Sequence, residues 1–304
     1  AWFSWRFVEA PFRSKTNFSR RSIFKLSLAS ALFFSFVGFG LHHSNGLLEY
    51  YPKEKQKALE SFINPSEYLN EMHKQIRLSE FSKSNNKKDI LIIGDSHSED
   101  LVNAVFEAGL NNDMEFSSYY ILLACGFLFV DDKKNSAGAN LNCQTEGTFF
   151  DNDLQTQMSL ADEIWVISMW RHRHIPYMAK TLENIQSINK NIKLFGTKRF
   201  VSRSSKWFNV IDKDDWDSKI FDDHDLSQYE GVSKINDDLG NIAESLGIEF
   251  VNTQHLVCRG EALCSIYIDG NIISADGSHL TKPGAKILGA SLKNMLEKNN
   301  RKEN

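Results

Sequence analysis

The stretch that decides the fold is DILIIGDSHS, residues 89–98. Its first half is a nearly unbroken apolar run ending at Gly94, which is typical of a strand buried on both faces of a parallel sheet. Apolar residues then recur at helical spacing over residues 101–106. The stretch therefore predicts a strand, a tight turn and a helix, with Ser96 at the turn. Open α/β folds bind ligands at this carboxyl edge of the sheet, where helical N–H groups also favour negative charge.

Further strand and helix patterns alternate along residues 89–299. Strands are predicted at 114–123, 163–168, 192–197 and 248–252, and helices near 151–162, 176–190, 230–246 and 282–297. Strands that alternate with helices imply right-handed crossovers and a doubly wound parallel sheet. We therefore expect an α/β domain with helices on both faces of the sheet.

A second stretch, DGSHLTKPGA at residues 276–285, contains candidate catalytic partners for the serine at the turn. By itself, Ser96 is more simply interpreted as a helix N-cap. Asp276 and His279 are close enough in sequence to share one loop, where the carboxylate would orient the imidazole toward a third group. Thr281 is suited to cap the helix that follows this loop. A serine, a histidine and an aspartate are the residue types that nucleophilic acyl transfer needs.

Gly94-Asp95-Ser96 and Asp276-x-x-His279 resemble the first and last sequence blocks of the SGNH hydrolase family. They are most similar to the subgroup that is fused behind a membrane acyltransferase family 3 domain. In that subgroup the first block often continues with His, and the last is followed by Leu, a hydroxyl residue and Gly-Ala, as here. The resemblance implies a three-layer α/β/α sandwich and a catalytic triad of Ser96, Asp276 and His279.

The predicted oxyanion site departs from the parent family. Typical SGNH enzymes carry Gly-x-Asn-Asp after the third strand, whereas residues 168–171 read SMWR. The N–H of Ser96 is one candidate oxyanion donor, and the N–H of Gly126 is a second. Trp170 and Arg171 are candidates for lining a sugar-binding cleft, through a flat apolar face and hydrogen bonds. A rim of solvated charges is the alternative for this run.

The N-terminal part predicts attachment to a membrane. Residues 1–21 resemble the end of an upstream membrane acyltransferase domain, with an amphipathic interfacial segment as the alternative. Residues 22–43 predict a transmembrane helix, because a span needs about 17–25 apolar residues. Basic residues precede this segment, so the positive-inside rule leaves the bulk of the chain outside the cytoplasm. A cleaved signal peptide is the alternative.

The remaining boundaries follow from composition. Residues 44–88 are polar and predict a linker or extension, with a helix beginning at Pro65 that packs on the next domain. Residues 89–299 are then the SGNH domain, and residues 300–304 a tail. The chain begins with Ala rather than Met, so we expect a fragment or a processed product.

All four cysteines, Cys125, Cys143, Cys258 and Cys264, follow the predicted span, which favours an oxidising compartment. Three disulfide pairings are possible. Pairing of neighbours, Cys125 with Cys143 and Cys258 with Cys264, needs the least chain reorganisation and resembles the fused subgroup. Structural zinc is the alternative, although the spacings are not two short pairs. The acidic run at 212–225 lacks the glycine and closing glutamate of a calcium loop, and we interpret it as a solvated insertion; no metal site is predicted.

The formal net charge of −4 argues against a general nucleic-acid binder. The resemblance implies that a membrane domain of the same native chain passes an acetyl group outward from acetyl-CoA, and that this domain binds no cofactor. We predict an O-acetyltransferase of the bacterial inner membrane, whose periplasmic SGNH domain acetylates a glycan acceptor such as O-antigen lipopolysaccharide. A periplasmic carbohydrate acetyl esterase and a non-catalytic glycan-binding module are the alternatives.

Overall fold

The computed structural model describes two compact units, residues 1–59 and 60–304, so the predicted connector 44–88 is divided between them. The described residues are 2, 5–6, 19–51, 53, 56, 65–82, 84, 86–122, 128–130, 147–200, 223–260, 264, 266–269, 271–274 and 276–303. Gly126, Cys125 and Cys143, and with them the predicted second oxyanion donor and first disulfide, lie outside these residues.

The first unit contains the helix α3 (Arg20–His43), which confirms the predicted N-terminal apolar helix. Ser19 caps its start by accepting a hydrogen bond from the Ser22 N–H, and Ser44 is the C-cap that follows its last residue. The helix has 24 residues, no buried residue and an 18-residue window of mean hydropathy 1.7, so it is long and apolar enough to cross a membrane. The unit also contains the short helix η2 (Leu48–Tyr50).

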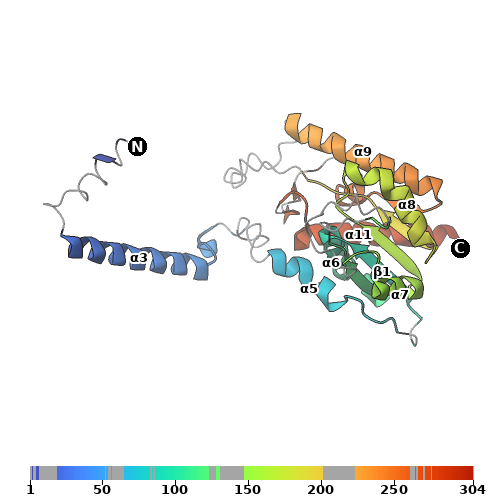
Figure 1. Ribbon diagram of the computed structural model, residues 1–304, viewed down its shortest axis with the longest axis horizontal. Coiled ribbons are helices and arrows are strands. Elements are labelled where there is room, and N and C mark those ends of the chain that lie inside the picture. Colours follow the sequence, from blue (N-terminus) through green and yellow to red (C-terminus); the bar gives the residue numbers. More distant parts are fainter. Residues whose placement is uncertain are drawn as a thin grey trace. The chain divides into compact units, whose positions relative to one another are not determined.

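The second unit is built on a five-stranded parallel sheet with the order β2-β1-β3-β4-β5 (Figure 1). The strands are β1 (Lys88–Gly94), β2 (Met114–Tyr120), β3 (Glu163–Ile167), β4 (Ile192–Phe195) and β5 (Glu249–Val251). All four strands predicted after β1 are present. β2 ends at Tyr120, before the predicted residue 123, because its partner β1 ends at Gly94. The Ile121 N–H bonds to the Gly94 carbonyl, which is the last carbonyl of β1.

Helices cover both faces of the sheet, which confirms the three-layer α/β/α fold. They are α5 (Pro65–Gln75), α6 (Ser96–Glu107), α7 (Asn152–Leu160), α8 (Ile175–Gln186), α9 (Asp223–Ser245), α10 (Thr253–Val257) and α11 (Lys282–Glu303). The short helices η3 (Leu110–Asn112) and η5 (His172–His174) and the hairpin β6 (Tyr267–Ile268)–β7 (Asn271–Ile272) complete the described elements.

The alternating side chains of β1 separate two cores. Leu91 and Ile93 pack in one core with side chains of α7, α8 and α9. Ile90 and Ile92 pack in the other with side chains of α5, α6 and α11. All four are at most 1% exposed, which explains why this strand is continuously apolar rather than alternating.

Helix α9 begins earlier than predicted. It starts at Asp223, inside the acidic run 212–225; residues 212–222 lie outside the described ones, so the interpretation of this run as a solvated insertion stays a prediction. Acidic residues in the first turn of a helix are favoured by the helix dipole, so this part of the run is compatible with a helix start.

Two glycines allow backbone to approach closely around the turn after β1. A Cβ atom at Gly94 would lie 2.3 Å from the Ile167 carbonyl oxygen and 2.5 Å from the Ser98 Cβ. At Gly289 of α11, a Cβ would lie 2.2 Å from the Ala104 carbonyl oxygen of α6. Both contacts are closer than real Cβ atoms make, so the position of α6 against β3 and α11 depends on these glycines.

Candidate active site

Ser96 is the first residue of α6, at the carboxyl end of β1. The N-cap of this helix is Asp95, not Ser96, because the Asp95 carboxylate accepts the His97 N–H at 2.9 Å. The other carboxylate oxygen of Asp95 accepts hydrogen bonds from the Ser168 hydroxyl at 2.7 Å and the Met169 N–H at 2.9 Å. Asp95 is 1% exposed and thus ties the turn that carries Ser96 to the end of β3. The Ser96 hydroxyl is left available for other partners.

The structure brings Ser96, His279 and Asp276 into one chain of hydrogen bonds. The Nδ1 of His279 lies 2.6 Å from an oxygen of Asp276, and its Nε2 lies 2.8 Å from the Ser96 Oγ. A carboxylate only accepts, so Nδ1 carries the proton and the Nε2 of the neutral ring accepts from Ser96. The second oxygen of Asp276 accepts the N–H groups of Ser278 and His279, both at 2.8 Å.

The electrostatics of the pair favour a charged carboxylate. Burial by itself would raise the pKa of Asp276, but the hydrogen bonds from the His279 ring and from two backbone N–H groups hold it well below its ordinary value. The hydrogen bond to Asp276 raises the pKa of His279, and burial opposes that rise. His279 is therefore a stronger base than an isolated imidazole.

His97 of α6 contacts the loop that carries Ser278 and His279. It is fully buried, its Nε2 lies 3.0 Å from the Ser278 Oγ, and its ring meets the His279 ring edge-on at 5.9 Å. Burial, followed by the charges of Lys198 and His279, lowers the pKa of His97 well below its ordinary value, so this ring is neutral. In the sequence, His97 stood out only as part of the family resemblance.

A buried ion pair joins the same helix to the same loop. The Nζ of Lys198 lies 2.5 Å from one oxygen of Asp100, and the two side chains are 0% and 1% exposed. The other oxygen of Asp100 accepts the Leu280 N–H at 2.8 Å. Asp100 lies one helical turn after Ser96, so the pair fixes the residue after His279 to the helix that carries Ser96. Sequence reasoning missed this pair, because each residue taken alone is interpreted as a solvated charge.

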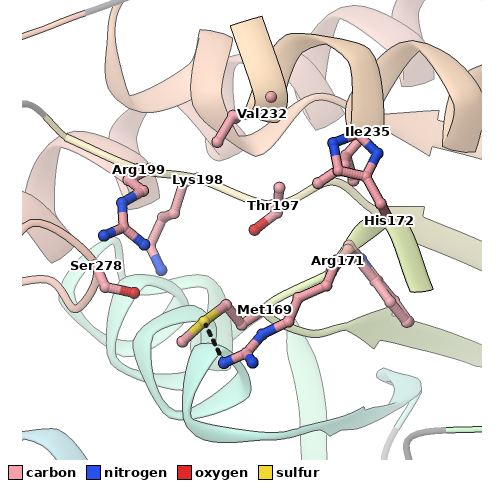
Figure 2. A pocket seen from close by; sticks show the side chains of 11 residues that line it. Met169, Arg171, His172, Thr197, Lys198, Arg199, Val232, Ile235 and Ser278 are labelled. Atoms are coloured by element: carbon pink, nitrogen blue, oxygen red, sulfur yellow. Dashed lines mark hydrogen bonds between the residues drawn. The ribbon is translucent and has the colours of Figure 1, made fainter. Parts of the chain in front are cut away.

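A pocket of about 380 Å³ adjoins these residues (Figure 2). It is lined by Met169, Trp170, Arg171, His172, Thr197, Lys198, Arg199, Gly231, Val232, Ile235 and Ser278. Arg171 is exposed, as predicted for a residue at the active edge. Trp170 is only 2% exposed, and its indole N–H donates to the Phe195 carbonyl oxygen at 2.8 Å. Trp170 therefore lines the pocket as predicted, but its ring packs mainly in the core and offers little of its flat face to a ligand.

Two other predicted features are placed by the structure. The disulfide Cys258–Cys264 is present, as the pairing of neighbours predicted. His174, the second histidine of the His-x-His run, has the backbone N of Arg171 at 3.3 Å from its Nδ1 and the Nε of Arg173 at 3.3 Å from its Nε2; the neutral ring accepts a hydrogen bond at only one of these nitrogens. Among the described residues, no group of three or more metal-ligating side chains includes this histidine.

The comparisons with known proteins agree with this architecture. The model of a family described as the SGNH domain fused to AT3 domains matches residues 65–294. The periplasmic domain of the Salmonella ser. Paratyphi A lipopolysaccharide acetyltransferase is similar in fold, with a TM-score of 0.55 and 17% identity over 78% of this chain and 98% of that one. A putative GDSL-like lipase from Parabacteroides merdae has a TM-score of 0.41 and 14% identity, covering 70% and 98% of the two chains. No curated protein gave a significant match to the chain.

Proposed function

The chain belongs to the family of SGNH domains that are fused to AT3 domains, and from this premise we propose that it is a serine-dependent O-acetyltransferase acting on a glycan. The observation that carries the proposal is the hydrogen-bonded chain from Ser96 through His279 to Asp276. An Asp–His pair directed at a hydroxyl is the arrangement by which serine becomes a nucleophile.

In the first half of the proposed reaction, Ser96 is acetylated. The Ser96 Oγ forms a bond to the acetyl carbonyl carbon while the Nε2 of His279 takes the hydroxyl proton. The bond between that carbon and the donor oxygen or sulfur then breaks, and the leaving group takes the proton back from His279. Asp276 keeps the ring oriented and stabilises the imidazolium. The Ser96 N–H, at the start of α6, is the proposed oxyanion donor, and such a donor contributes about 3–4 kcal/mol in related chemistry.

In the second half, a sugar hydroxyl replaces the leaving group. His279 takes its proton, the sugar oxygen forms a bond to the acetyl carbon, and the bond to the Ser96 Oγ breaks with return of the proton to Ser96. Water is the competing nucleophile and is far more concentrated than any sugar. Transfer therefore requires the sugar to be held against the acyl-serine. In this proposal the adjoining pocket holds the sugar.

The cellular setting of the proposal rests on the fusion that defines the family. A membrane domain of the same native chain would supply acetyl groups that come ultimately from acetyl-CoA, and α3 would anchor this part to the bacterial inner membrane. The catalytic unit would then act in the periplasm on O-antigen or a similar surface glycan. The similar Salmonella domain is the periplasmic part of a lipopolysaccharide acetyltransferase, which supports this setting. The disulfide Cys258–Cys264 fits an oxidising compartment.

A periplasmic carbohydrate acetyl esterase is the second candidate, because it would use the same three residues. The exposure of the site favours it: the side chains of His279 and Asp276 are 27% and 52% exposed, so water has access to the base. A purified chain that hydrolyses an aryl acetate with no effect of any added sugar would support the esterase.

The decisive experiment compares ester-linked acetyl groups on the surface glycan of cells carrying the intact protein or its Ser96→Ala variant. We expect Ser96→Ala to abolish them. The matched control is Ser159→Ala, which removes an exposed hydroxyl on α7 and should leave acetylation normal. Normal acetylation by Ser96→Ala would contradict both enzymatic candidates and favour a non-catalytic glycan-binding module.

A further inference from the structure

The pocket beside the triad carries positive charge on one side. Its lining includes Arg171, Lys198 and Arg199, and none of the described residues that line it is a carboxylate. The chain as a whole has a formal net charge of −4, so a described lining with three basic residues and no acidic one differs from the overall composition. A concave, cationic wall next to a reacting centre is suited to bind an anion.

Arg171 and Lys198 contribute differently to this charge. Lys198 is paired with Asp100 inside the protein, which largely neutralises it. Arg171 is exposed at the mouth of the pocket, and its guanidinium contacts the uncharged sulfur of Met169 at 3.7 Å. No carboxylate in the described part of the chain is paired with Arg171. Its planar fork of N–H donors matches the geometry of a carboxylate or a phosphate.

The two arginines reach the pocket from different strands. Arg171 follows β3 and Arg199 follows β4, and Figure 2 shows both at the border of the same space as Ser278. Ser278 directly precedes His279, and the charge of Lys198 acts on the His279 ring. An anion held here would therefore lie beside the base that must activate the acceptor.

The rest of the pocket is less polar. Val232 and Ile235 of α9 line its upper border in Figure 2, and Met169 adds a thioether. Apolar side chains of this kind pack against the carbon skeleton of a ligand, whereas the acetyl group itself is small and carries no charge. A cationic site beside the acyl-serine therefore serves the acceptor rather than the acyl group.

We propose that this pocket binds a negatively charged group, a carboxylate or a phosphate, on the glycan acceptor. The proposal rests on the acyl-transfer function above and makes it narrower: the acceptor is an acidic glycan. Arg171 is the main contact to the charged group, and Arg199 adds to the attraction from the neighbouring strand end. Because the contact is electrostatic and partly open to solvent, binding weakens as salt concentration rises.

The first test measures binding by calorimetric titration of the full chain in detergent with methyl glucuronide, methyl glucoside and inorganic phosphate. We expect methyl glucuronide to bind about tenfold or more tightly than methyl glucoside, and phosphate to compete with it. Arg171→Gln should abolish the preference and Arg171→Lys should restore part of it. Arg173→Gln removes a neighbouring exposed charge that does not line the pocket, so it should retain the preference. Equal binding of the two sugars, or no binding of either anion, would overturn the proposal.

The second test separates this proposal from the proposed function. The purified chain is acetylated at Ser96 with an aryl acetate, and loss of the acetyl group is followed with each sugar. Faster deacylation by the glucuronide, together with formation of its acetyl ester, supports the proposal. A chain that binds the glucuronide but is never acetylated refutes the enzymatic function and leaves the anion site standing. A chain that is acetylated but transfers its acetyl group equally to both sugars refutes the proposal of an acidic acceptor and leaves the enzymatic function standing. The same holds if the glucuronide only slows the acetylation of Ser96.

Discussion

Removing the ammonium group of the buried pair, in the variant Lys198→Met, should be one of the most destabilising single changes in the molecule. The two side chains are 0% and 1% exposed, so the Asp100 carboxylate would keep only the Leu280 N–H as a partner. Breaking a buried ion pair by removing one member costs about 3–5 kcal/mol. Since a domain of this kind is stable by about 5–15 kcal/mol, the free energy of unfolding would fall by a large fraction.

The matched double variant distinguishes a buried-charge penalty from a loss of packing. Asn at position 100 retains an oxygen for the Leu280 N–H, and Met at position 198 fills much of the lysine volume. The double variant Asp100→Asn/Lys198→Met should therefore lose about 2 kcal/mol less than the sum of the two single variants. The control is Lys180→Met, which breaks a pair with Glu183 whose side chains are 64% and 50% exposed, and which should cost less than about 1 kcal/mol.

The assay is urea unfolding of the full chain in detergent, followed by fluorescence of the buried Trp165. Additive losses in the double variant would refute the reasoning, because they would mean that the two charges are not energetically coupled. A loss below about 1 kcal/mol for Lys198→Met would do the same, because it would place the pair with ordinary surface pairs.

Three further outcomes follow from the site and its packing. Asp276→Asn should lower the rate of Ser96 acetylation by about 10⁴-fold, and should move the acid limb of its pH profile to lower pH, because the hydrogen bond that His279 donates to Asp276 is the main cause of the raised pKa of His279. The pH dependence of kcat/KM with an aryl acetate checks this, and an unmoved limb would assign the titration to another group. Gly94→Ala should cost about 3 kcal/mol or more in urea unfolding, since the new methyl group collides with the Ile167 carbonyl, and a wild-type midpoint would show that the strands separate easily. Replacing both Cys258 and Cys264 by Ser should lower the free energy of unfolding by about 2 kcal/mol, seen as a lower Tm and a smaller further drop on reduction than in the wild type. An unchanged Tm would mean that this bridge does not stabilise the fold.

The sheet and its two helical layers were predictable because they depend on local pattern. The run from Ile90 to Ile93 has no polar position, which left burial on both faces as the consistent interpretation, and the two cores on either side of β1 bear it out. The order of the strands and the exact ends of β2 and α9 depend on hydrogen bonds and packing between distant segments. Those contacts leave no periodic signal in the sequence.

The candidate site divides in the same way. Ser96, Asp276 and His279 were identified through two short blocks and a family resemblance, and no pattern of apolar residues would have paired them. Asp100 and Lys198 are 98 positions apart, and in sequence each is indistinguishable from a solvated charge. The burial of the Trp170 ring was not predictable, because it is decided by a hydrogen bond to the carbonyl of Phe195, a partner that only the fold supplies.

The geometry of the site is imposed mainly by α6. Three consecutive residues of the loop, Ser278, His279 and Leu280, contact His97, Ser96 and Asp100 of that one helix. The half-exposed Asp276 carboxylate holds the loop together from within, through the Ser278 and His279 N–H groups, while the contacts to α6 fix the loop to the helix. Because α6 is itself fixed by the close approach of α11 at Gly289, a displacement of the helix moves the nucleophile and the loop together. The distance between Ser96 and His279 is thereby protected against motions that would change it if the two were carried on independent elements.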